Sequence, residues 1–301
     1  MFRSVSLTIC LLAGVFLFPA FAARAAVEAV DDTGAAVSLE RPAKRVIPLY
    51  GAFAEMLYAV NAGAAVCART QADQYPPQIR ELPSVGTHMH PNVEMILGLK
   101  PDLVIFSATR KEETEEAVRL RHAGVPVAIF APKSFDDVFS VMKRLGVLTG
   151  HAEEAEDAVR RLRGRLEAVA ERLKSLEERR KVFFEVRAEP LTGAGAGSIV
   201  QEILSSSGAE NSLKSERAIV LYNFEALLLN DPDVYIVQKG PMNRNPLEPK
   251  KRAHFDRLRA VREGRVLSVD EFLYSRPGPR CVDAVEQLAA ALYPDRFVAG
   301  R

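Results

Sequence analysis

The sequence predicts an α/β protein with two lobes, each built on a central, mainly parallel β-sheet flanked by helices, and bridged by a single long α-helix. Short apolar runs alternate with segments of helical spacing along most of the chain. A long amphipathic segment lies near the middle, and one pattern recurs on both sides of it. The length of 301 residues agrees with about two domains of ordinary size.

The charge balance excludes one broad class of function. Lys and Arg total 40 and Asp and Glu total 39, a net charge of +1, whereas a protein that binds nucleic acid electrostatically shows a basic excess. With 48% hydrophobic and 26% charged residues, the composition is that of an ordinary globular protein. We therefore expect compact lobes with their own cores and no nucleic-acid partner.

The first 25 residues have the features of a secretory signal peptide. Arg3 precedes an apolar run over 7–18, and a series of small residues follows up to Ala25 and Ala26. The run is shorter than the ~20 residues of a membrane-spanning helix. A lipoprotein would place a cysteine at the cleavage point, whereas Cys10 lies inside the run. We expect cleavage near Ala25 and a soluble protein exported to the periplasm.

Residues 26–149 are predicted to form the N-terminal lobe. Alternating polar and apolar residues around an Asp-Asp-Thr-Gly turn indicate a hairpin at its start. One later strand is apolar throughout, which is typical of a parallel strand covered on both faces. Ser134 is a plausible helix N-cap. After the hairpin we expect strands over 45–49, 65–68, 103–106 and 125–130 and helices over 51–61, 92–99, 112–122 and 134–149.

Residues 150–181 are predicted to form the helix that connects the lobes. From Ala155 to Leu176 the apolar residues recur at spacings of four and three, which places one apolar stripe along a helix over 152–181. The same spacing suits a coiled coil for about three heptads, but Gly164 interrupts it and the sequence has no second such segment. We expect a lone helix of about 45 Å that packs on both lobes.

The alternation of strand and helix resumes in residues 182–301, the predicted C-terminal lobe. Its glycine-rich segment has the spacing G-x-G-x-G, which departs from the dinucleotide-binding fingerprint, so we expect no nucleotide there. The predicted elements are strands over 182–186, 234–237 and 266–269, helices over 199–206, 255–261 and 282–292, and a glycine-rich loop over 193–197.

An internal repeat relates the two lobes. Residues 93–105 align without gaps on residues 224–236, at a constant offset of 131 positions. Each copy contains a glutamate, a short apolar helix, a Pro-Asp pair and an apolar strand. A Pro-Asp turn is common in proteins, but it does not explain the matched glutamates Glu94 and Glu225.

The sequence gives little support for catalysis. It contains no Walker A loop and no HExxH, GxSxG or CxxC motif, and nothing assembles a nucleophile with a base. His88 and His90 would point to one side of an extended chain, but a zinc or manganese site needs three or four ligands. We expect no enzyme and no resident cofactor, with a hydrolase as the enzyme-class alternative.

Five segments together resemble a known family. They are RPAKRVI at 41–47, YPP at 75–77, LPSVG at 82–86, PNVE at 91–94 running into LKPDLV at 99–104, and SRPGPR at 275–280. In this order they are similar to the periplasmic substrate-binding proteins of ABC importers for iron-siderophores, haem and cobalamin, which have two α/β lobes joined by one long helix. The resemblance implies a small-molecule metal chelate, a membrane permease and its ATPase as partners, and we expect a monomer.

In this family a glutamate on each lobe docks onto arginines of the permease. The resemblance places that role on Glu94 and Glu225, the pair that the repeat matches. Two exposed carboxylates that face basic pockets fix orientation and raise the association rate. The alternative is that both are first-turn residues of helices, where the helix dipole favours an acid.

Loops after the predicted strands contain cations and phenols, where α/β sheets bind ligands. Arginines would hold an anionic chelate through charge-assisted hydrogen bonds, and tyrosines would stack or hydrogen-bond. Tyr50, His88 or His90 would ligate the metal if the ligand is haem or a bare ion. The candidate ligand-binding residues are Tyr50, Arg69, Tyr75, His88, His90, Arg110, Arg187, Tyr222, Arg244 and Arg276.

Four classes of ligand remain open. A ferric siderophore is expected first because of the arginines; haem would need an axial Tyr or His; cobalamin is slightly disfavoured by the absence of Trp; a bare metal or an oxyanion is the fourth. A sensing module that serves a signalling receptor instead of a permease would share every feature above. Because one continuous helix resists hinge bending, we expect only a small closure of the lobes.

Overall fold

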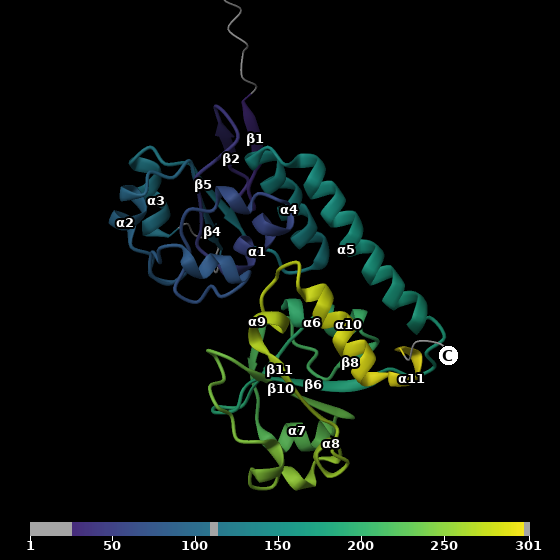
Figure 1. The fold of residues 1–301 in the computed structure, drawn as a ribbon. Coiled ribbons are helices and arrows are strands. Elements are labelled where there is room, and N and C mark those ends of the chain that lie inside the picture. The colour runs from purple at the N-terminus through teal and green to yellow at the C-terminus, as the bar shows by residue number, and fades with distance from the viewer. Residues whose placement is uncertain (1–25, 109–113, 298–301) are drawn as a thin grey trace, which may run out of the picture.

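The computed structural model describes residues 26–108 and 114–297. It shows two lobes joined along one side by the long helix α5 (Figure 1), as the α/β prediction requires. The predicted signal peptide and the candidate Arg110 lie outside the described residues. Within the described ranges no helix combines the length and the apolar character needed to cross a bilayer.

The N-terminal lobe is built on a parallel sheet of order β3-β4-β5. The first four residues of β4 are buried, as expected for a strand covered on both faces. The strand predicted over 65–68 is wrong, because residues 63–65 form a 3₁₀ turn and only Val66 bridges to β3. The strands are β1 (Val27–Val30), β2 (Ala36–Leu39), β3 (Val46–Pro48), β4 (Leu103–Ser107) and β5 (Val127–Phe130), and the helices are α1 (Gly51–Ala59), α2 (Val93–Gly98), α3 (Glu115–His122) and α4 (Phe135–Thr149).

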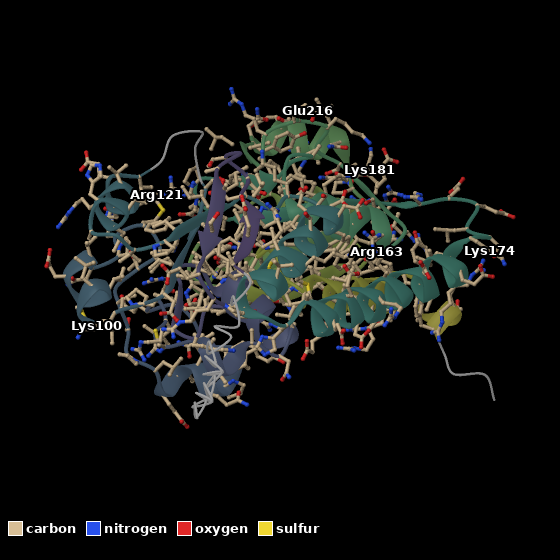
Figure 2. The ribbon with its side chains drawn as sticks, turned by 90° about the horizontal axis from the view of Figure 1, so that it is seen from above. Lys100, Arg121, Arg163, Lys174, Lys181 and Glu216 are labelled. Carbon is tan, nitrogen blue, oxygen red and sulfur yellow. The ribbon has the colours of Figure 1, made fainter. Side chains whose placement is uncertain are left out.

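Helix α5 (Ala152–Leu173) leads from the N-terminal lobe past Arg163 to Lys174 at one end of the molecule (Figure 2). The helix predicted over 152–181 ends at Leu173, because Arg180 already begins the first strand of the second lobe. The buried face of α5 includes Val159 and Val169, which belong to an apolar cluster drawn from both lobes. The helix therefore packs as part of a shared core.

The C-terminal lobe has a six-stranded mixed sheet of order β11-β10-β6-β7-β9, with β8 paired to β6. Strands β6, β8, β10 and β11 pair in parallel, and β7 pairs antiparallel with β6 and β9. The glycine-rich loop predicted over 193–197 begins within β7, and the helix predicted over 255–261 is a 3₁₀ turn followed by one short helix. The strands are β6 (Arg180–Arg187), β7 (Thr192–Ala194), β8 (Ala209–Asn211), β9 (Ile219–Leu221), β10 (Val234–Lys239) and β11 (Val266–Asp270), and the helices are α6 (Ile199–Ser206), α7 (Phe224–Asn230), α8 (Arg259–Arg262), α9 (Glu271–Tyr274), α10 (Cys281–Leu292) and α11 (Pro294–Phe297).

The sequence repeat forms the same local structure in both lobes. Helices α2 and α7 each follow an N-cap asparagine, Asn92 and Asn223, whose side-chain oxygen accepts a hydrogen bond from the backbone N–H three residues later. After the helix the chain passes through a left-handed residue, Lys100 with φ 49° or Asp231 with φ 37°. The repeat thus encodes the beginning and the end of each helix.

The aspartates of the two Pro-Asp pairs have a matched structural role. Asp102 accepts a hydrogen bond from the backbone N–H of Arg45 at 3.0 Å, just before β3. Asp233 accepts one from the backbone N–H of Lys181 at 2.8 Å, at the start of β6. Each aspartate therefore links one strand, β3 or β6, to the parallel strand that follows the repeat helix, β4 or β10.

Candidate functional site

Residues that follow the strands of both lobes meet between the lobes. Tyr50 follows β3, and Pro132 and Lys133 follow β5 in the N-terminal lobe. Val186 at the end of β6 and Met242 after β10 face them from the other side, and all except Tyr50 line an interlobe pocket of about 250 Å³. This is the edge at which open α/β sheets bind ligands.

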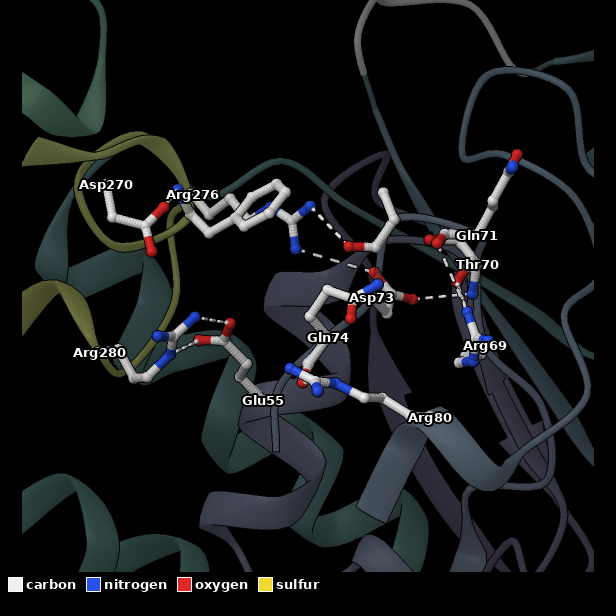
Figure 3. Close-up of polar contacts among 12 residues, drawn as sticks. Glu55, Arg69, Thr70, Gln71, Asp73, Gln74, Arg80, Asp270, Arg276 and Arg280 are labelled. Atoms are coloured by element: carbon white, nitrogen blue, oxygen red, sulfur yellow. Dashed lines mark hydrogen bonds and ion pairs between the residues drawn. The ribbon is translucent and has the colours of Figure 1, made fainter. Parts of the chain in front are cut away.

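A short segment of the C-terminal lobe closes one side of this space by contacting the N-terminal lobe (Figure 3). Arg280 donates two hydrogen bonds to the carboxylate of Glu55 on α1, at 3.0 and 2.6 Å. The Glu55 side chain is only 3% exposed and that of Arg280 is 20% exposed. Burial raises the pKa of Glu55, and the hydrogen bonds and charge of Arg280 oppose the rise. The pair is therefore a buried ion pair across the two lobes.

Arg276 makes a second contact between the lobes. One guanidinium nitrogen donates to the backbone carbonyl of Ala72 at 3.3 Å, and another lies 3.8 Å from the buried carboxylate of Asp73. The guanidinium stacks on the ring of Phe272, 3.9 Å from its centroid. A Cβ at position 51 would lie 2.2 Å from Arg276 Nη1, so this close approach requires Gly51.

Tyr50 and His88 lie beside the Arg276 contact. Their rings are 5.7 Å apart, and the Tyr50 ring is 5.9 Å from the Arg276 guanidinium. Burial raises the pKa of Tyr50 to about 12, so its phenol is neutral at pH 7. Partial burial, and then the charge of Arg276, lower the pKa of His88. The imidazole is therefore neutral near pH 7 and retains a lone pair for a metal or a hydrogen bond.

The other candidate residues of the N-terminal lobe have separate surroundings. The Arg69 guanidinium donates to the backbone carbonyl of Thr70 at 3.0 Å. Tyr75 is 46% exposed, and the Arg280 guanidinium lies 4.1 Å from its ring centroid. His90 is exposed. Of these residues, only Tyr75 joins the interlobe contacts directly.

In the C-terminal lobe the structure brings together two of the three candidates that remain besides Arg276. Arg187 and Arg244 line one cavity of about 680 Å³, and Met242 lines both this cavity and the interlobe pocket. Tyr222 is placed elsewhere, because its ring packs at 5.6 Å from that of Phe183 in the core of the lobe.

The matched glutamates Glu94 and Glu225 are exposed at the second residue of α2 and of α7. Glu94 forms an ion pair with Arg119 at 3.1 Å, with side-chain exposures of 78% and 60%. An ion pair this exposed contributes little to stability. Either carboxylate can therefore accept another partner at small cost.

Within residues 26–108 and 114–297, no three His, Cys, Asp or Glu side chains gather in a way that could hold a metal ion. In this part of the chain, no nearby carboxylate therefore adds a third ligand to His88 and His90.

Sequence reasoning did not single out the carboxylates that pair with the arginines. Glu55 lies among the buried residues Phe53, Met56 and Leu57 on α1, and an acid within such an apolar run is a signal of a buried partner. Asp73 carries no such signal, because it lies in an irregular loop. Met242 shows no pattern in the sequence that would link it to the cleft.

Comparison with known proteins agrees with this architecture. Residues 46–272 match the family model described as periplasmic binding protein. The chain belongs to this family. It is a family of transport substrate-binding proteins, which agrees with a binding cleft between the lobes.

Individual members of the periplasmic binding protein family cover most of the chain. An uncharacterised ABC transporter substrate-binding lipoprotein of Bacillus subtilis is 29% identical over 89% of this chain and 85% of its own length. The crystal structure of the periplasmic vitamin B12 binding protein of Vibrio cholerae is 27% identical with a TM-score of 0.73, covering 85% and 99% of the two chains. A periplasmic haem binding protein of Pseudomonas aeruginosa is 26% identical with a TM-score of 0.74, covering 84% and 93%.

The pair Glu55–Arg280 gives a prediction with a definite pH dependence. Arg280→Gln should lower the free energy of unfolding at pH 7 by about 3–5 kcal/mol, because it leaves a buried carboxylate without its counterion. Burial raises the pKa of Glu55 and Arg280 opposes the rise, so the folded variant, which lacks Arg280, takes up the proton at a higher pH than folded wild type does. The deficit relative to wild type should therefore shrink as the pH falls toward 4.5, the ordinary pKa of the group.

Urea unfolding at several pH values measures this effect. The double variant Glu55→Gln/Arg280→Gln is the control, since a neutral amide needs no counterion and its deficit should vary little with pH. An Arg280→Gln deficit that is the same at pH 5 and pH 7 would contradict the assignment.

Proposed function

We propose that this family member is exported to the periplasm, captures a metal chelate between its lobes and delivers it to the permease and ATPase of an ABC importer. The observation that carries the proposal is the cleft, where the end of β6 and the loops that follow β5 and β10 converge on one pocket between the lobes. The B. subtilis relative is named as the substrate-binding lipoprotein of an ABC transporter. The signal-like residues 1–25 support export.

For the ligand, we propose a cobalamin-type corrinoid ahead of a ferric siderophore. The siderophore expectation depended on a pool of cleft arginines, but Arg276 is engaged by Asp73 and Ala72 and Arg69 by backbone carbonyls. With the charges of Arg69 and Arg276 engaged, and with Arg187 and Arg244 in the separate cavity of the C-terminal lobe, the interlobe part of the cleft favours a ligand whose periphery is mostly neutral amides, as in cobalamin. The V. cholerae structure is named for vitamin B12 binding.

Haem is the second candidate, and a specific observation favours it. His88 has a lowered pKa, and its ring lies 5.7 Å from that of Tyr50 beside the Arg276 contact, where a neutral imidazole nitrogen could ligate iron. The P. aeruginosa structure is named for haem binding. Haem carries two carboxylates and thus more negative charge than a corrinoid.

Absorbance titration tests the ligand. Mature protein should bind cyanocobalamin with one site and more tightly than hemin or a ferric siderophore. His88→Ala should weaken binding by up to about tenfold, because a ring contact contributes ~0.5–1.5 kcal/mol. His122→Ala, an exposed histidine on α3, is the matched control and should bind as wild type. Tighter binding of hemin would favour the second candidate, and binding of the siderophore alone would contradict both.

We further propose that Glu94 and Glu225 are the permease-docking residues. Charge reversal of both to Arg should abolish ligand-dependent stimulation of the importer's ATPase in proteoliposomes and leave ligand affinity unchanged. Glu153→Arg is the control, because Glu153 is also an exposed acid at the second residue of a helix, α5. It therefore lies in the same part of a helix dipole as Glu94 and Glu225, but it does not belong to the sequence repeat.

Stimulation that survives the double reversal would overturn the docking assignment. An equal loss with Glu153→Arg would show that the effect comes from the helices and not from docking. A signalling receptor as the partner would leave the ATPase unstimulated even by wild-type protein.

A further inference from the structure

The cavity of the C-terminal lobe has a rigid wall. The buried carboxylate of Glu185 accepts hydrogen bonds from Tyr235 at 2.5 Å and from Asn243 at 3.1 Å, and it is paired with Arg252. The side-chain oxygen of Asn243 in turn accepts a hydrogen bond from the backbone N–H of Ala188 at 3.0 Å. The loops that follow β6 and β10 are therefore held to one another by a buried network.

This network fixes the backbone next to two cations. Arg187 is the neighbour of Ala188, and Arg244 is the neighbour of Asn243. Both side chains are exposed and line the cavity of about 680 Å³. Neither makes a hydrogen bond or an ion pair to any residue of 26–108 or 114–297, whereas Arg252, Arg276 and Arg280 all do.

The remaining lining of the cavity is mixed. Apolar side chains contribute through Leu191, Phe224, Leu247 and Phe255, and one exposed acid, Glu189, also lines the cavity. Two further cations of the lining already have partners, Lys251 in Glu248 and Arg252 in Glu185. The cavity therefore offers two arginines without partners beside an apolar surface. Met242 lines both this cavity and the interlobe pocket, so the two are neighbours.

We propose that this cavity is a subsite for an anionic side arm of the chelate, a phosphodiester or a carboxylate, which Arg187 and Arg244 bind together. The inference depends on the proposed function, because it assigns the arm of a ligand whose metal-containing ring lies between the lobes. Two guanidinium groups on fixed backbones bind such an anion through charge-assisted hydrogen bonds. The paired arginines of the interlobe contact are not available for this role.

Two pairs of ligands distinguish binding of the anionic arm from binding of the metal-containing ring, because the members of each pair share the ring and differ in the anionic group. Cyanocobalamin carries a phosphodiester arm that dicyanocobinamide lacks, and hemin carries two carboxylates that hemin dimethyl ester lacks. Wild type should bind the anionic member of a pair more tightly. Arg187→Gln and Arg244→Gln should each weaken binding of that member by about tenfold or more and leave its partner unchanged. Isothermal titration and absorbance spectra measure all four ligands.

Arg161→Gln is the matched control, because Arg161 is an exposed arginine on α5, remote from the cavity. Discrimination within the corrinoid pair identifies the arm as a phosphodiester, and discrimination within the haem pair identifies it as a carboxylate. Equal losses for both members of a pair, or no loss, would overturn the subsite while leaving the proposed function intact. Wild type that binds none of the four would overturn both proposed ligands and the subsite with them. Thermal unfolding at wild-type temperature confirms that each variant is folded.

Discussion

Two buried carboxylates of the N-terminal lobe, Glu55 and Asp73, depend on guanidinium groups that come from the other lobe. Glu55 lies on α1, directly after the strand β3 that leads to Tyr50, and its charge is compensated by Arg280. Asp73 faces Arg276 across 3.8 Å. A buried charge without a partner is costly. If the lobes separated at this point, both carboxylates would lose their guanidinium partners.

This constraint, together with the shared core, sets the geometry of the cleft. The apolar cluster that contains Phe53 and Phe130 of the N-terminal lobe also contains Val159 of α5 and Phe184 of the C-terminal lobe. The interlobe pocket lies next to the ion pairs, and these contacts hold its walls in place. A cleft held in this way binds its ligand with little reorganisation, which lowers the entropic cost of binding. It also keeps the distance between Glu94 and Glu225 nearly constant, which is what their proposed role in docking would require.

Much of the fold could be predicted from the sequence because local signals agree with the tertiary structure. The N-cap Ser134 forms a full capping box, and the repeat's asparagines and Pro-Asp pairs begin and end α2 and α7. The failures have physical causes: the apolar run at Ala65–Ala68 is too short to pair beyond Val66, and the stripe of α5 continues past Leu173 in sequence after tertiary contacts have ended the helix. Helix periodicity by itself cannot locate such an end.

The site was less predictable than the fold. Sequence position placed Arg276 near the cleft, but only the structure shows that Asp73 and Ala72 already engage it, which changes the ligand that the cleft favours. Arg187 and Arg244 look like the other loop arginines in sequence, and what separates them is the absence of a partner in the described part of the chain. Pairing between residues about 200 positions apart, as in Glu55–Arg280, leaves no local pattern.

The central claim is that the two lobes behave as one body, held by the interlobe ion pairs and by the core that includes α5. Small-angle X-ray scattering of the mature protein with and without saturating cyanocobalamin tests it directly. The account predicts that the radius of gyration and the distance distribution of the two states superimpose within error. A clear compaction on ligand binding would contradict it, because it would require the Arg276 and Arg280 contacts to form only in the closed state.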